Sequence, residues 1–170
     1  MKPFDELSRE ELATLVSVYA KNWLAHDGCW FLAAEEKYGH GPAVELDIRS
    51  WERFAIAEAR RIKHAFNLPD RGGLQALEQA LQYRLYAAIN RQETFWESGE
   101  VLVFRMLDCR VQQARTSKNL PPFACKPVGY AEFSQFAKTI DPRIRTDCVF
   151  CPPDPVSDAY CAWRFRLEPD

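Results

Sequence analysis

Five of the six cysteines lie in the C-terminal part of the chain, and their spacing indicates metal chemistry. Cys148 and Cys151 form a C-x-x-C pair, Cys161 follows across a proline-rich loop, and Cys109 and Cys125 lie upstream. Soft thiolates at short spacing suit tetrahedral zinc, with an iron–sulfur cluster as a less favoured alternative. We therefore predict that four of Cys109, Cys125, Cys148, Cys151 and Cys161 bind one zinc ion, and that Cys29 takes no part.

Strand periodicity favours convergence of these thiols. In an extended strand, residues two apart share a face. This puts Cys109 in phase with Val103, and Cys161 in phase with Trp163. A hairpin centred near residue 155 would place Cys148 opposite Cys161. Buried thiols that act as small core residues, or one labile disulfide, are the alternatives.

His26 and Glu58 form the second candidate site. Each lies on the apolar stripe of a predicted helix, and the turn between the two helices centres near residues 41 and 42. An antiparallel hairpin then places the two side chains at the same height. A buried carboxylate is costly unless it is paired or protonated. We predict a catalytic acid–base pair, or part of a metal site, at the end of a small-molecule pocket.

Structural pairings of Glu58 are the alternatives. They are a His26–Glu58 hydrogen bond without catalysis, or an ion pair of Glu58 with Arg61 or Arg84. A transition metal at this place would need a third protein ligand. The nearby candidates do not clearly share the face of His26; they are Asp27, Cys29, Glu35 and Glu36.

Four arginines alternate along the two C-terminal strands that the sequence predicts. They are Arg143, Arg145, Arg164 and Arg166. Opposed like charges are unfavourable unless an anion or acidic side chains lie between them. Interleaved acids such as Asp147 are the favoured explanation, and a carboxylate- or phosphate-bearing ligand is the alternative.

The N-terminal half of the chain, which precedes the five C-terminal cysteines, is predicted to be helical, and the C-terminal half is predicted to contain the strands. Ser8 with Glu11 fits a capping box, and a helical stripe runs from Leu12 to Ala33. Two further helices are predicted over about residues 42–65 and 74–88, a strand over 101–111, a helix over 129–140, and strands over 143–151 and 160–167. We expect an α+β fold in one compact unit: a helical half (1–97), and a cysteine-containing half (98–170) with an antiparallel sheet and one helix.

Composition limits the partners and the compartment. The 170 residues are 47% hydrophobic with a net charge of −2, so a broad basic field for nucleic acid is not expected. The N-terminus has no apolar segment typical of a signal peptide, and no apolar run has the length of a membrane span. We expect a cytoplasmic protein with a small-molecule ligand and no nucleic-acid or membrane partner. The sequence does not predict an oligomeric state.

Three segments of the helical half, residues 22–28, 51–54 and 58–62, resemble a family of uncharacterised bacterial and archaeal cytosolic proteins. The cysteine-containing half resembles the domain shared by 4-vinyl reductase-type ligand-binding proteins and L-2-amino-thiazoline-4-carboxylate hydrolase-like proteins. The matching residues there are Cys109, residues 125–129 and residues 160–165. This second resemblance implies a small α+β domain that binds small molecules, sometimes with zinc at the cysteines. The proline-rich loop before Cys161 and the doubled cysteine at 148 and 151 depart from that pattern.

The leading functional expectation is a metal-containing small-molecule protein. It could be a hydrolase of a small heterocyclic or amide substrate that uses His26 and Glu58 for acid–base chemistry. A four-thiolate zinc site is closed and would be structural. The alternative is a non-enzymatic ligand-binding or sensor domain with the aromatic seam as its pocket.

Overall fold

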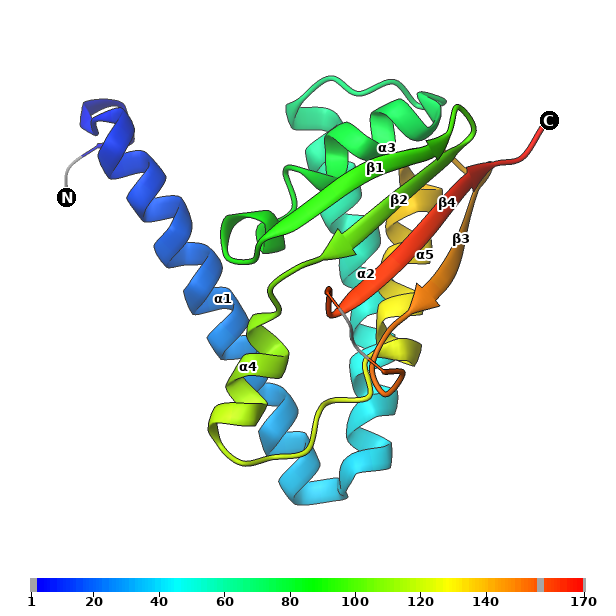
Figure 1. Ribbon diagram of the computed structural model, residues 1–170. Helices are drawn as coiled ribbons and strands as arrows, with labels where there is room; N and C mark the ends of the chain where they lie inside the picture. The colour runs from blue at the N-terminus through cyan, green and yellow to red at the C-terminus, as the bar shows by residue number, and fades with distance from the viewer. Residues whose placement is uncertain (1–2, 156–157, 170) are drawn as a thin grey trace.

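The computed structural model describes residues 3–155 and 158–169 and has an α+β fold, as the sequence predicts. One antiparallel sheet has the strand order β1-β2-β4-β3. Helices α2 and α5 lie against one side of this sheet, and α1 extends away from it at its N-terminal end (Figure 1). A short 3-10 helix, η1 (Phe4–Glu6), precedes α1.

Two long helices form an antiparallel hairpin. Helix α1 (Arg9–Tyr38) begins at Ser8, whose side chain and backbone form the predicted capping box with Glu11. Gly39, with φ of +84°, ends α1 and precedes α2 (His40–Ala65). This positive φ favours glycine because it has no Cβ. The turn lies two or three residues earlier than the sequence predicts.

The predicted apolar stripe of α1 is only partly buried. Trp23 packs against the aromatic rings of α2, with its ring centroid 5.2 Å from that of Phe54. Tyr19 and Trp30 are instead exposed, at 57% and 67%. The stripe prediction is therefore wrong for most of α1. The helix contacts the rest of the protein from Ala20 onward, beside α2 and α4 (Figure 1), and it does so partly through other residues, such as Leu24 and Phe31.

The chain enters the sheet earlier than predicted. Helix α3 (Gly73–Leu81) and the 3-10 helix η2 (Leu85–Ala88) precede the hairpin of β1 (Gln92–Ser98) and β2 (Val101–Met106). The strand β1 was not predicted, and the strand predicted over 101–111 ends at Met106. The residues beyond it form helix α4 (Arg110–Ser117). The cysteine-containing half thus has two helices rather than one.

Helix α5 (Lys126–Ile140) and the hairpin of β3 (Ile144–Phe150) and β4 (Cys161–Leu167) complete the fold. Cys148 pairs with Trp163, and Cys161 pairs with Met106 of β2. The prediction that Cys148 lies opposite Cys161 is therefore wrong by two residues. A register shift between Cys148 and Phe150 and the proline-rich loop account for the difference, since a turn of that kind does not fix register.

Acidic side chains separate the arginines of this hairpin, as the favoured explanation predicted. Arg145 pairs in register with Arg166, and Arg166 forms an ion pair with Asp147. Arg145 bonds Glu168 at 2.6 Å, and Arg164 holds the carboxylate of Glu97 through two nitrogens at 2.8 and 2.9 Å. The opposed charges are thus neutralised by the protein itself.

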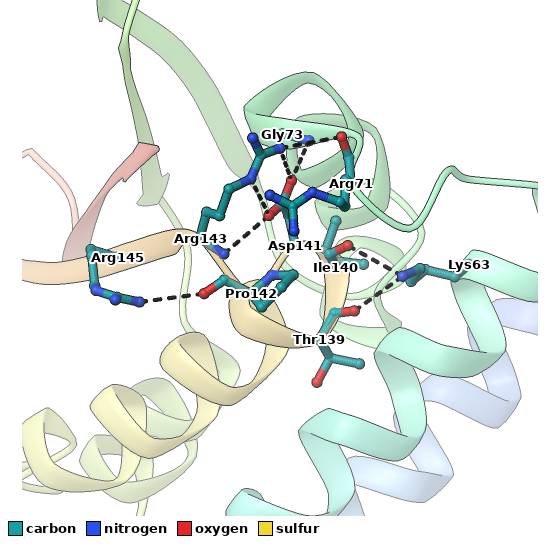
Figure 2. A network of polar contacts seen from close by, with 9 residues as sticks. All are labelled: Lys63, Arg71, Gly73, Thr139, Ile140, Asp141, Pro142, Arg143 and Arg145. Carbon is teal, nitrogen blue, oxygen red and sulfur yellow. Dashed lines mark hydrogen bonds and ion pairs between the residues drawn. The ribbon is translucent and has the colours of Figure 1, made fainter. Parts of the chain in front are cut away.

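A buried carboxylate joins the end of α5 to the start of α3. The Asp141 side chain is fully buried and accepts hydrogen bonds from Gly73 N and from the Arg143 guanidinium (Figure 2). Lys63 of α2 donates to the carbonyls of Thr139 and Ile140, each at 3.2 Å. These bonds satisfy helix-terminal carbonyls that the helix cannot pair internally. They fix α5 against α2 and α3.

The Asp141 carboxylate should contribute stability that depends on pH. Hydrogen bonding from Arg143 lowers its pKa from 3.8 to about 2. A lowered carboxylate pKa stabilises the folded state above the unfolded pKa, and the contribution is lost as the pH falls through the folded pKa. Asp141→Asn should lower the free energy of unfolding at pH 7 by about 2 kcal/mol in denaturant titrations. The difference from wild type should vanish between about pH 4 and pH 2.

Asp70→Asn is the matched control, because the Asp70 side chain is 97% exposed and its ion pair with Lys63, at 3.0 Å, is open to solvent, where such pairs contribute little. It should change stability by less than about 0.5 kcal/mol. Equal effects of the two substitutions would contradict the role assigned to Asp141.

Candidate ligand cavity

A cavity of about 420 Å³ lies between the helical hairpin and the ends of the central strands. Its walls come from α1, α2, α4, α5, β4 and the segment around η2. Most of the lining is apolar; representative residues are Leu24, Phe31, Trp51, Met106, Val128 and Phe133. Cavities of roughly 300–1,000 Å³ with apolar walls and few polar groups are typical of small-molecule sites.

The carboxylate of Glu58 is held by Arg84, one of the alternatives that the sequence left open. Arg84 Nε donates to Glu58 Oε2 at 2.9 Å, and Leu85 N donates to Glu58 Oε1 at 3.1 Å. Arg84 Nη2 also lies 2.7 Å from Glu132 Oε1 of α5. All three charged side chains are more than nine-tenths buried. We call Glu58, Arg84 and Glu132 the charged triad. Within it, Glu58 has a structural role as the partner of Arg84, whereas Glu132 both pairs with Arg84 and lines the cavity.

The predicted His26–Glu58 pair is wrong. His26 is exposed on α1, and Glu58 is buried under η2. Trp23, one turn before His26, makes the contact with α2 instead. Equal height in a hairpin does not bring two side chains together when one of them, here His26, lies on the exposed side of its helix.

The structure brings four of the five C-terminal cysteines to the cavity wall: Cys109, Cys125, Cys151 and Cys161. The Cys151 thiol is in hydrogen-bond contact with the thiols of Cys125 and Cys161, and these contacts together with burial raise its pKa strongly. Burial raises the pKa of Cys109 to about 12. Cys148 lies apart from this wall on β3, and burial raises its pKa to about 11.

These thiols are not positioned as metal ligands. Across residues 3–155 and 158–169, no group of three or more His, Cys, Asp and Glu side chains is arranged to hold a metal ion. The donor types nevertheless suit a soft metal, and Cys151 already touches two other thiols. The zinc site therefore remains a prediction.

Two further carboxylates line the cavity, and the sequence analysis did not assign them to the site. Asp27 belongs to α1 and Asp47 to α2. Desolvation, together with the negative charges of Asp27 and Glu132, raises the pKa of Asp47 to about 7. Desolvation also raises the pKa of Asp27. The signal was present in the sequence, because Asp47 lies one turn before Trp51 on the buried side of α2.

Two polar donors in the cavity wall lack partners. Asn90 is 9% exposed and Trp163 is fully buried. Asn90 Oδ1 accepts from Arg110 N at 3.1 Å, but Asn90 Nδ2 and Trp163 Nε1 have no hydrogen-bond acceptor among the described residues. A buried donor without an acceptor is unfavourable by about 1–3 kcal/mol, and such groups are rare in proteins. Both residues line the cavity, where a ligand could accept these bonds.

The fold and the cavity define an α+β protein with an internal pocket between a helical hairpin and a sheet. Over residues 5–167 the chain matches the family of unknown function DUF6125, and it belongs to that family. No curated protein and no solved structure matches the chain. Within the described residues, no helix is long and apolar enough to cross a membrane.

Substitutions of Glu58 and of His26, which do not pair in the structure, should differ sharply in their effect on stability. Glu58→Ala removes one of the two carboxylates that neutralise the buried Arg84, and it should lower the free energy of unfolding by about 3–5 kcal/mol. His26→Ala should change it by less than about 0.5 kcal/mol. Chemical denaturation followed by circular dichroism measures both values. A large loss in His26→Ala would contradict the exposed position of His26.

Proposed function

We propose that this protein is a cytoplasmic small-molecule-binding protein whose ligand lies in the cavity between α1, α2 and α5. The observation that carries the proposal is the apolar cavity of about 420 Å³ with two unpartnered buried donors in its wall. A cavity lined by apolar groups excludes water, and fixed donors then orient a ligand that accepts their hydrogen bonds. We propose no nucleic-acid or membrane partner.

Two features of the chain support this proposal. The resemblance of the cysteine-containing half to 4-vinyl reductase-type domains implies small-molecule binding, and the cavity wall contains the cysteines of that resemblance. All six cysteines are free thiols, as expected in a reducing compartment.

The hydrolase mechanism is not carried forward, because His26 and Glu58 do not pair and Glu58 is held by Arg84.

A neutral fluorescent probe tests the cavity directly. N-phenyl-1-naphthylamine fluoresces strongly in apolar surroundings, and it should bind the purified protein with one site per chain. Gly28 lines the cavity, and a Cβ built on it meets no atom within 4 Å. Gly28→Phe should therefore place a ring in the cavity and weaken probe binding at least tenfold in a fluorescence titration.

Gly41→Phe is the matched control. Gly41 is also a helical glycine with open space around its Cβ position, but it does not line the cavity. Its probe affinity should equal that of wild type. If the probe does not bind, or if both variants bind as wild type does, the proposed binding function is wrong.

Metal binding by the wall cysteines is a second candidate function. The contact of the Cys151 thiol with Cys125 and Cys161 favours it, and Cys109 supplies a fourth thiol on the same wall. Zinc would take these four thiolates in a closed tetrahedron and would stabilise the region where α5, β4 and the proline-rich loop meet. We propose that Cys148 is not a ligand.

Elemental analysis of protein purified without chelators tests this candidate. One zinc per chain is expected in wild type and in Cys148→Ser, and less than about a tenth of that in Cys151→Ser. Cys29→Ser controls for non-specific thiol binding and should retain the metal. Zinc-free wild-type protein that also fails to bind added zinc would leave only buried thiols.

A further inference from the structure

Three acidic side chains line the cavity, and they limit the kind of ligand that fits there. Asp27, Asp47 and Glu132 come from three different helices and line the same cavity. They are close enough for the charges of Asp27 and Glu132 to act on Asp47. Only Glu132 has a buried cationic partner, Arg84, and that cation is shared with Glu58.

Asp27 and Asp47 have no ion-pair partner in the part of the chain that the structure describes. The other cations of the lining are placed differently: Lys21, Arg110 and Lys118 are exposed. Arg115 Nε donates to the Pro121 carbonyl at 2.8 Å, and Arg115 Nη1 lies 3.5 Å from Glu35 Oε2. Charges in contact with solvent are screened, whereas partly buried ones are screened much less. In the part of the chain that the structure describes, these cations are thus exposed or held by other acceptors, which leaves Asp27 and Asp47 to a cationic group on a ligand.

The aromatic walls also suit a cation. Trp51 and Tyr86 stack with ring centroids 5.8 Å apart, and both line the cavity with Phe133. The faces of aromatic rings attract organic cations, most strongly where water is excluded. The unpartnered donors of Asn90 and Trp163 independently require a hydrogen-bond acceptor on the ligand.

We propose that the cavity binds an organic amine in its protonated form, with the ammonium group between Asp27, Asp47 and Glu132 and an apolar body against the aromatic walls. This inference rests on the proposed binding function and names the chemical class of its ligand. Hydrogen-bond acceptors on the body of the amine meet Asn90 and Trp163. The ammonium group also favours the ionised form of Asp47, because a nearby cation lowers the carboxyl pKa that burial and the neighbouring acids raise.

Three probes with one shared aromatic body separate charge from shape. They are 2-(1-naphthyl)ethylamine, 2-(1-naphthyl)ethanol and 1-naphthylacetate, which at pH 7.5 are a cation, a neutral molecule and an anion. Isothermal titration calorimetry on the full chain should give an affinity at least tenfold higher for the amine than for the alcohol. The acetate should bind most weakly.

Two variants connect this preference to the carboxylates. Asp47→Asn and Asp27→Asn should each reduce amine affinity at least fivefold while the alcohol binds as it does to wild type. Glu45→Gln is the matched control, because Glu45 lies on the exposed side of α2 and pairs with Arg49 at 2.7 Å. It should leave all three affinities unchanged. Circular dichroism establishes that each variant is folded.

The outcomes distinguish this inference from the function on which it rests. If N-phenyl-1-naphthylamine binds in the cavity but the amine binds no tighter than the alcohol, the protein binds small molecules and the amine preference is wrong. The preference is also wrong if it survives both aspartate substitutions. If none of the four compounds binds, the binding function itself is wrong.

Discussion

The guanidinium of Arg84 is the constraint on which the architecture depends. A buried cation must be paired, and Arg84 is placed between Glu58 of α2 and Glu132 of α5. Its face also lies over the ring of Phe136, with 4.7 Å between the guanidinium carbon and the ring centroid. Because the residue belongs to the segment between α3 and η2, its two carboxylate contacts fix three separate parts of the chain together. One of the two carboxylates that hold Arg84, that of Glu132, also lines the cavity.

The cavity follows from this arrangement. Helix α5 packs on the sheet with one side and on α2 with the other, and the triad fixes the distance between them. Trp23 fixes helix α1 in place through its contacts with Trp51, Phe54 and Tyr86. Other residues of α1, such as Leu24 and Phe31, then form one wall of the cavity. Apolar walls with a few fixed polar groups are the result.

The sequence predicted the elements better than their contacts. The capping box at Ser8, the two long helices, α5 and the C-terminal hairpin follow local rules, and these were predicted correctly. Strand β1 was missed because its half-buried positions include the polar residues Gln92 and Thr94, so the sequence shows no alternation of apolar and polar residues there. The His26–Glu58 pair failed because a hairpin argument fixes height but not the direction in which each side chain points. The position of Glu58 on an apolar stripe indicated that this carboxylate needs a partner, and Arg84 was one of the candidates. Only the tertiary fold shows that Arg84 is the partner.

The cysteines show the same limit. Their density predicted convergence, and Cys109, Cys125, Cys151 and Cys161 do share one wall, but Cys148, on the outer strand β3, does not line the cavity. In the sequence, Asp27 and Asp47 are acidic residues within predicted helices, Asn90 is a loop amide and Trp163 is a core aromatic. They become candidates for ligand binding only when the fold places them around one cavity.

The central claim is that a small molecule binds within this cavity, and nuclear magnetic resonance tests it most directly. A ¹H–¹⁵N spectrum resolves the Trp163 indole N–H and the Asn90 side-chain amide, and both should shift as N-phenyl-1-naphthylamine is added. The indole signal of Trp30, which is exposed at 67% and lies outside the cavity lining, should stay in place. Shifts confined to Trp30 and other exposed groups, with Trp163 and Asn90 unchanged, would contradict the account.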